Sequence, residues 1–181
     1  MGVTIRQAGM ADAAALAELA ALTFPLACPS SSPAEDIQSF IAERLNATVF
    51  AAYLGDPHRA VFVAAEAVPE GGERLLAYTM LVDAPPSDAD VAAVVATPRA
   101  VELSKCYAHP DCHGGGVPAR IMAASLDWAA ALGAPQVWLG VNSENAKART
   151  FYEKHGFSIA GNRSFQLGNQ VEHDFVMVRP A

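Results

Sequence analysis

Residues 101–117 read VELSKCYAHPDCHGGGV and carry the clearest structural signal in the chain. The first half, as far as about His109, has the composition of a strand, and the three glycines that follow make a turn. A helical pattern comes next and ends at Gly133 and Pro135, ahead of another apolar strand at residues 136–141. One face of that helix carries Met122, Leu126, Ala129 and Leu132. Strand, turn, helix and strand make a βαβ unit, which places two parallel strands inside a mixed sheet.

Further elements are predicted on both sides of this unit. Two strands form a hairpin and two more form a last antiparallel pair, in addition to a short first strand. These strands are residues 3–6, 59–68, 75–82, 157–167 and 171–178. Residues 48–54 fit either a helix or a strand, and residues 84–98 a loop with at most one helical turn.

Three more helices are predicted from their first residues. Asp12 can cap the first helix, and the stretch 32–35 (Ser-Pro-Ala-Glu) combines a capping box with a proline at the first helical position of the second. Residues 145–155 form the last helix, which Gly156 closes. The buried face of the first helix is expected to carry Leu16, Leu19, Ala20 and Thr23.

Composition and charge limit the class of protein. The 181 residues are enough for one domain, spanning 1–181, that buries a core without disulfides. No apolar run approaches the roughly 20 residues of a membrane span and no signal peptide is evident, so we expect a soluble, cytoplasmic protein without a membrane partner. The net charge is −7, with twelve acidic and five basic side chains in residues 1–100. Nucleic acid is therefore an unsuitable partner, whereas a cationic small molecule suits the acidic first half.

The glycines at 114–116 open a helix directly after a strand, and this arrangement favours an anion. Inward N–H groups and the positive end of the helix dipole make a phosphate site, although glycine triplets also occur in plain flexible loops. A P-loop is excluded because Gly-Lys-Ser/Thr is missing. Gly114, Gly116 and Ala119 match a dinucleotide fingerprint, but that motif needs a doubly wound fold, for which too few residues remain.

A zinc site is another reading of the same segment. Its candidate ligands are Cys106, His109, Cys112 and His113. The spacing is cramped, and these side chains could converge only by distorting the loop. We therefore predict no metal.

A second informative segment, residues 145–157, reads NAKARTFYEKHGF. Asn145 and Tyr152 are seven residues apart and share a helix face, with the small Ala148 between them. That face leaves space for a thin ligand bounded by an amide at one end and a phenol at the other. The alternative is that Tyr152 is a half-buried core aromatic.

Together and in this order, the two segments resemble the GNAT superfamily of N-acetyltransferases. The family loop reads Arg/Gln-x-x-Gly-x-Gly/Ala, and the next helix carries Asn, Ala and an aromatic-Tyr pair ahead of Gly-Phe. The resemblance is strong over residues 101–178 and limited to element order before them. It implies an α/β (α+β) fold with a mixed, mostly antiparallel sheet, a central parallel strand pair and helices on both faces. It also implies an acyltransferase that moves acetyl from acetyl-CoA to an amine by direct attack in a ternary complex.

The resemblance assigns catalytic roles to Tyr152 and Glu102. Tyr152 matches the family tyrosine that protonates the departing thiolate. Glu102 falls where some members keep a general base, which must remove a proton from the amine before the amine can attack. The alternative for Glu102 is a structural carboxylate.

The residues expected to bind acetyl-CoA follow from the same resemblance. The pantetheine arm would lie along Tyr107, Ala108 and His109, with the acetyl carbonyl near the Ala108 N–H. Asn145 would hydrogen-bond the cofactor beside Tyr152, and the pyrophosphate would sit on the loop and first helical turn. That loop and turn consist of His113, Gly114, Gly115, Gly116, Val117, Pro118 and Ala119.

The sequence departs from the family pattern at two positions. His113 stands where arginine or glutamine is usual, and Pro118 removes one N–H from the phosphate site. We expect acetyl-CoA binding to be weaker by about 1 kcal/mol as a result.

The acceptor is the least defined part of the reaction. The stretch 138–141 (Trp-Leu-Gly-Val) and the spacing of Phe165, Gly168, His173, Asp174 and Met177 resemble the bacterial spermidine/spermine acetyltransferase branch. A small-molecule amine such as a polyamine is therefore expected, with a protein N-terminus or an aminoglycoside-type amine as alternatives. A non-catalytic acetyl-CoA sensor on the same fold is the contrasting class. Family members often pair through their last strands, which is compatible with a homodimer.

Overall fold

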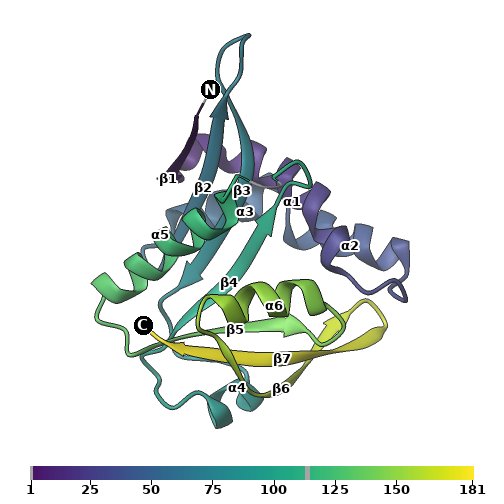
Figure 1. The fold of residues 1–181 in the computed structure, drawn as a ribbon. Coiled ribbons are helices and arrows are strands. Elements are labelled where there is room, and N and C mark those ends of the chain that lie inside the picture. Colours follow the sequence, from purple (N-terminus) through teal and green to yellow (C-terminus); the bar gives the residue numbers. More distant parts are fainter. Residues whose placement is uncertain (1, 113–114) are drawn as a thin grey trace.

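The computed structural model describes residues 2–112 and 115–181 (Figure 1). The strands of this part of the chain are β1 (Val3–Gln7), β2 (Arg59–Ala67), β3 (Glu73–Val82), β4 (Val101–Ala108), β5 (Gln136–Asn142), β6 (Ser158–Leu167) and β7 (Gln170–Pro180). Its helices are the 3-10 helix η1 (Met10–Asp12), α1 (Ala13–Ala27), α2 (Ala34–Arg44), α3 (Ala47–Gly55), α4 (Ala89–Val94), α5 (Val117–Ala131) and α6 (Ala146–Lys154). The ambiguous residues 48–54 are thus helical, because Asn46 caps α3 by accepting a hydrogen bond from the Val49 N–H.

All of these strands form one sheet in the order β1-β2-β3-β4-β5-β7-β6. Neighbouring strands run antiparallel except β4 and β5, which are parallel. The predicted mixed sheet with a central parallel pair is therefore confirmed. In the described strands, β4 pairs with β5 only at Val101 with Val137 and at Glu102 with Trp138. Beyond these pairs the two strands diverge (Figure 1), and this opening positions the site.

Helices cover both faces of the sheet, as predicted. On one face, Leu16 of α1 and Phe50 of α3 pack in a buried cluster with Tyr78 of β3. On the other face, Met122 of α5 and Tyr152 of α6 share a cluster with alternate residues of β4 and β5. The short α4 adds a smaller cluster with Trp138, on the same face as α1. Each helix thus buries its apolar side against the sheet.

Three local predictions are wrong in detail. Pro33, not Ser32, is the N-cap of α2, and Ser32 hydrogen-bonds Glu172 instead of closing a capping box. Asp12 precedes α1 but its carboxylate binds the Arg6 guanidinium at 2.9 Å and makes no side-chain cap to the helix. Leu132 lies after the end of α5 and is 43% exposed. In the first two cases a tertiary partner outcompetes the local hydrogen bond.

The helical stretch Met10–Ala27 is long and apolar enough, by composition alone, to cross a membrane. Its Leu16 and Ala20 are nevertheless fully buried, and Phe24 packs in the same cluster under the sheet. The core helix of a globular domain has this character as well. Packing accounts for only part of the hydrophobicity of this segment, because its Met10, Leu22 and Leu26 are exposed.

Candidate active site

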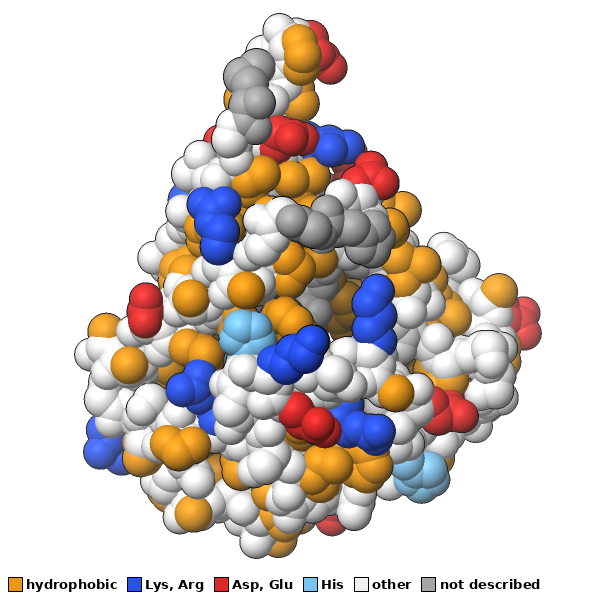
Figure 2. All heavy atoms as spheres, in the orientation of Figure 1, with side chains coloured by type: hydrophobic (Ala, Val, Ile, Leu, Met, Phe, Trp, Pro, Cys, Tyr) orange, Lys and Arg blue, Asp and Glu red, His pale blue; other side chains and the backbone are white. Residues whose placement is uncertain are grey.

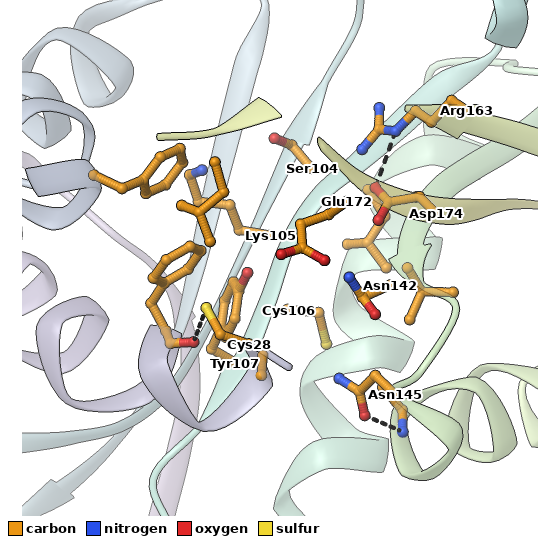
Figure 3. Close-up of a pocket in the computed structure, with 18 of the residues that line it drawn as sticks. Cys28, Ser104, Lys105, Cys106, Tyr107, Asn142, Asn145, Arg163, Glu172 and Asp174 are labelled. Carbon is orange, nitrogen blue, oxygen red and sulfur yellow. Dashed lines mark hydrogen bonds and ion pairs between the residues drawn. The ribbon is translucent and has the colours of Figure 1, made fainter. Parts of the chain in front are cut away.

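A pocket with a volume of about 560 Å³ opens where β4 and β5 separate. One wall comes from α1, α2 and α3, the floor from β4, and the opposite wall from β5, β6 and β7. Figure 3 shows polar side chains of these elements directed into it from both sides. The divergence of two parallel strands thus turns the centre of the sheet into a binding site.

An irregularity in β4 brings several polar side chains to this pocket. Met80 pairs with Lys105 and Leu81 pairs with Leu103, so Ser104 is an extra residue without a partner on β3. A bulge of this kind increases the twist of a strand and redirects its side chains. Glu102, Ser104 and Lys105 all line the pocket as a result.

The Tyr152 side chain reaches the pocket from α6 and is only 9% exposed. Burial raises the pKa of Tyr152 well above its ordinary value, so its hydroxyl is protonated at neutral pH. The Cys106 thiol lies beside it, and burial raises the pKa of that thiol to about 12. Cys106 is therefore a neutral wall of the pocket and Tyr152 a proton donor.

Glu102 lines the pocket near the last point of contact between β4 and β5. Burial raises the pKa of its carboxyl, and the nearby cations Arg163 and Lys105 lower it by less. A carboxylate with a raised pKa is a stronger base than one in water. Glu102 therefore has the position and the basicity to take a proton from a ligand in the pocket.

Two asparagines mark the edge of the pocket between β5 and α6. Asn145 is the N-cap of α6, and its Oδ1 accepts a hydrogen bond of 3.1 Å from the Ala148 N–H. The Oδ1 of Asn142 accepts one of 2.9 Å from the Glu144 N–H. Both oxygens are thus occupied, and neither Nδ2 donates a hydrogen bond to a described residue. These amides remain as donors for a ligand (Figure 3).

At the end of β4, the backbone N–H groups of Ala108 and His109 point to opposite sides of the strand. His109 donates its N–H to the Leu76 carbonyl at 2.7 Å, and its own carbonyl accepts from Cys112. Successive N–H groups of a strand point to opposite sides, so the Ala108 N–H faces away from β3, toward the diverging β5. Of these two residues, Ala108 has the backbone that an extended ligand could pair with.

The start of α5 has the backbone of an anion site. Gly116 is the N-cap residue in the left-handed conformation, with φ 68°, and the helix begins at Val117. Val117 and Ala119 keep N–H groups without helical partners, whereas Pro118 has none. Figure 2 shows a hollow on the face near the end of β4, flanked by Lys and Arg side chains. Helix start and surface charge together suit phosphate groups.

The pocket wall opposite the helices, formed by β6 and β7, carries charged side chains. These side chains are held by contacts with other residues of the chain. Glu172 of β7 accepts a hydrogen bond from Ser32, and Arg163 of β6 pairs with Asp174 of β7 at 3.2 Å. The Arg163 guanidinium lies across Gly140, where an added Cβ would overlap it. Figure 3 shows the Glu172 carboxylate pointing into the middle of the pocket.

The structure brings together some of the predicted residues and not others. Glu102, Tyr107, Asn145 and Tyr152 line the pocket. His113 and Gly114 lie outside the described residues. The other predicted cofactor residues follow the end of β4 and the start of α5, beyond the pocket itself. They are Ala108, His109, Gly115, Gly116, Val117, Pro118 and Ala119.

The sequence reading missed several pocket residues. Asn142, Arg163 and Glu172 line the pocket but were not among the predicted site residues, although the motif comparison used positions next to Asn142 and on both sides of Glu172. A usable signal existed in β7, where Glu172 and Asp174 continue the face of the buried Val176. Charged residues on an inward strand face are unusual and mark a site.

Comparison with known proteins identifies the family to which this arrangement belongs. Residues 15–157 match the acetyltransferase (GNAT) family. The chain belongs to this family. It is also 45% identical over 170 residues to an uncharacterized N-acetyltransferase of Mycobacterium tuberculosis, covering 94% of this chain and 98% of the relative. The same values hold for an uncharacterized N-acetyltransferase of Mycobacterium bovis.

Solved structures share the fold of this GNAT acetyltransferase. The PaiA N-acetyltransferase of Thermoplasma acidophilum in complex with coenzyme A superposes with a TM-score of 0.74 at 18% identity, covering all of both chains. NAA60 of Arabidopsis thaliana in complex with a bisubstrate analogue gives a TM-score of 0.73 at 11% identity, covering 99% of each chain. At these identities the likeness concerns the fold alone. Family membership makes the protein an N-acetyltransferase.

Proposed function

We propose that this chain binds acetyl-CoA along the opening between β4 and β5 and transfers acetyl to the primary amine of a small cationic molecule. The observation that carries the proposal is the pairing of Glu102 and Tyr152 in one pocket. Burial raises the pKa of both groups, so Glu102 is a stronger base than in water and Tyr152 keeps its proton at neutral pH. Acid and base that face the same small volume suit acyl transfer to an amine.

The residues present fit acetyl-CoA. Ala108 offers an outward N–H for the pantetheine arm, and Asn145 an unpaired amide for the same ligand. The left-handed Gly116 and the N–H groups that follow it suit a pyrophosphate. When bound, acetyl-CoA supplies an acetyl group activated as a thioester.

Each proton in the transfer has a residue to carry it. An ammonium ion cannot attack, so Glu102 takes one proton from the acceptor and leaves a neutral amine. The new C–N bond then forms as the C–S bond breaks, and the Ala108 N–H stabilises negative charge on the acetyl oxygen. Tyr152 would give its proton to the departing sulfur and regain one from the acylated nitrogen, which must lose its second proton to become an amide. The products are an acetamide and free coenzyme A.

The acceptor class rests on the carboxylates of the pocket. Glu102 and Glu172 both line it, and Glu172 points toward its middle (Figure 3). These groups favour a ligand that arrives as an ammonium ion. A polyamine is one member of this class, and peptide N-termini and aminoglycosides are the alternatives. One catalytic domain over residues 1–181 is part of the same proposal.

The test is thiol release from acetyl-CoA in the presence of a panel of polyamines, short peptides, aminoglycosides and amino acids. Wild type should turn over at least one class, and Tyr152→Phe should lower kcat by about a hundredfold or more. The matched control is Tyr78→Phe, because the Tyr78 hydroxyl is buried and has no hydrogen-bond partner among the described residues. Acetyl-CoA binding without turnover on any acceptor would contradict the proposal and favour a sensor.

A further inference from the structure

The charged side chains that line the pocket differ in whether they form a hydrogen bond or an ion pair within the protein. Three of its carboxylates have polar partners within the protein: Asp174 pairs with Arg163, Glu172 accepts from Ser32, and Asp88 caps α4. Two of the cations that line the same pocket, Lys105 and Arg44, form no ion pair or hydrogen bond with any residue of the described part. The fourth carboxylate, Glu102, likewise forms no hydrogen bond or ion pair within the described part, so two cations and one carboxylate of the pocket are without such a partner.

Lys105 is the more informative of these cations. Its Nζ lies 5.8 Å from the centre of the Tyr53 ring, which is a weak cation–π contact. Burial lowers the pKa of its ammonium group, and the nearby Glu102 opposes this. A largely buried ammonium without a hydrogen-bonded partner is unfavourable unless a ligand supplies one.

Arg44 adds a second positive group on the same side of the pocket. It is the last residue of α2, which leads directly into α3 and its Tyr53. The arginine is exposed and needs no partner for stability, but a guanidinium at the mouth of a pocket suits a carboxylate or phosphate. Lys105 and Arg44 thus give the helix side of the pocket a positive character.

The two ends of the pocket therefore recognise different groups. Figure 3 shows Lys105 on the helix side and Asp174 with Arg163 on the far side. Glu172 lies between them, with a carboxylate that can accept a hydrogen bond from an ammonium group. A polyamine, which is cationic at every nitrogen, would bring an ammonium group against Lys105.

We infer that the acceptor carries both a primary amine and an anionic group, either a carboxylate or a phosphate, on one small molecule. Its anionic group binds Lys105 and Arg44, and its amine lies toward Glu172. This inference rests on the proposed acetyl transfer and revises its acceptor from a purely cationic amine to an amine that also carries an anionic group. It separates amino acids and aminoalkyl phosphates from polyamines.

The experiment compares ω-amino carboxylates of increasing chain length with the diamine and the monoamine of equal length. A second arm uses ω-aminoalkyl phosphates, which distinguishes the two sources of anion. At the best length, kcat/KM for an anion-bearing amine should exceed that of the matched diamine about tenfold or more. If kcat/KM is higher for the diamines than for both the ω-amino carboxylates and the ω-aminoalkyl phosphates, the inference is overturned and the proposed acetyl transfer still stands.

Substitutions at Lys105 test whether it causes the preference. Lys105→Met keeps the aliphatic stem and should raise KM for the preferred acceptor about ten- to hundredfold more than KM for the monoamine, whatever the variant does to kcat for both through Glu102. Lys105→Glu should shift the preference toward diamines. The control is Lys154→Met, because Lys154 is exposed at the end of α6 and does not line the pocket. An unchanged preference in both Lys105 variants would overturn the inference.

A binding measurement separates this inference from the proposed function. Calorimetric titration of the same amines is made with coenzyme A present, so that no turnover is needed. Binding of the anion-bearing amines that is lost in Lys105→Met supports the inference even where acetyl transfer fails. Turnover of amines without any anion preference supports the proposed function alone.

Discussion

The Ser32 hydroxyl donates a hydrogen bond of 2.9 Å to the Glu172 carboxylate, and both side chains are buried. This contact joins the segment between α1 and α2 to β7, across 140 residues of sequence. Glu172 is thereby held with its carboxylate in the pocket. The hydrogen bond connects the helix wall with the strand wall at the expected position of the acceptor amine.

Removal of this hydroxyl should affect both stability and acceptor binding. Ser32→Ala leaves a buried carboxylate with one hydrogen bond fewer, so the free energy of unfolding should fall by about 1.5–3 kcal/mol. KM for the acceptor should rise while KM for acetyl-CoA stays the same. Denaturant unfolding and steady-state kinetics measure the two effects. The control is Ser31→Ala at an exposed neighbour, and equal effects in both variants would contradict the role of Ser32.

Glu102 should impose a pH dependence on activity. Because burial raises its pKa, the base becomes available only above the ordinary pH range of a carboxyl group, and kcat/KM should rise with pH through that raised value. Glu102→Gln should remove this limb of the pH profile and lower kcat by about a hundredfold. A profile that keeps the same limb in Glu102→Gln would assign the base elsewhere.

The same substitution should have the opposite effect on stability. A carboxyl group whose pKa is raised on folding contributes its stability below the unfolded pKa and loses it as pH rises through the folded value. At neutral pH the ionised Glu102 is thus unfavourable in the folded chain. Glu102→Gln should therefore raise the melting temperature at neutral pH and change it little in acid.

Gly140 should be intolerant of a side chain. A Cβ there would overlap the Arg163 guanidinium, so Gly140→Ala should displace Arg163 from Asp174. The expected loss in free energy of unfolding is about 1–3 kcal/mol, together with a higher acceptor KM. Gly55→Ala at the end of α3 is the matched control, because nothing lies within 4 Å of its added Cβ. Equal stability of the two variants would show that Arg163 moves at no cost.

Pro118 should limit cofactor affinity. It occupies the first turn of α5 and has no N–H, so Pro118→Ala adds one donor at the expected pyrophosphate position. Acetyl-CoA should bind about fivefold more tightly, equivalent to about 1 kcal/mol. Calorimetric titration measures this, with Gly116→Ala expected to weaken binding because of its positive φ. Sub-micromolar affinity of the wild type for acetyl-CoA would contradict the idea that Pro118 weakens cofactor binding.

The second half of the chain was largely predictable from its sequence. The βαβ unit at residues 101–141 and the helix ahead of Gly156 appear where strand, glycine and helix patterns place them. Glu102, Tyr107, Asn145 and Tyr152 meet in one pocket, as local spacing and the GNAT resemblance suggested. The hydrophobic pattern predicts these positions because the site residues lie at the ends of regular strands and helices.

The other wall could not be predicted in the same way. The partner of Ser32 is 140 residues distant, so a local capping pattern gave the wrong hydrogen bond. Arg163 of β6 pairs with Asp174 of β7 and lies across Gly140 of β5, and local spacing does not show that these three residues are close in space. The extra residue at Ser104 is visible only in the pairing with β3. The cytoplasmic location, the homodimer and the single domain over 1–181 stay predictions.

The separation of β4 from β5 leaves a strand edge in the middle of the sheet. On the β5 side, the backbone groups of Cys106 and Ala108 pair with no strand of residues 2–112 and 115–181. Exposed strand edges are templates for pairing with other chains and promote aggregation. A pantetheine arm bound along Ala108 would cover this edge and, by mass action, favour the folded chain. Acetyl-CoA would then protect the protein from self-association as well as supply its reaction.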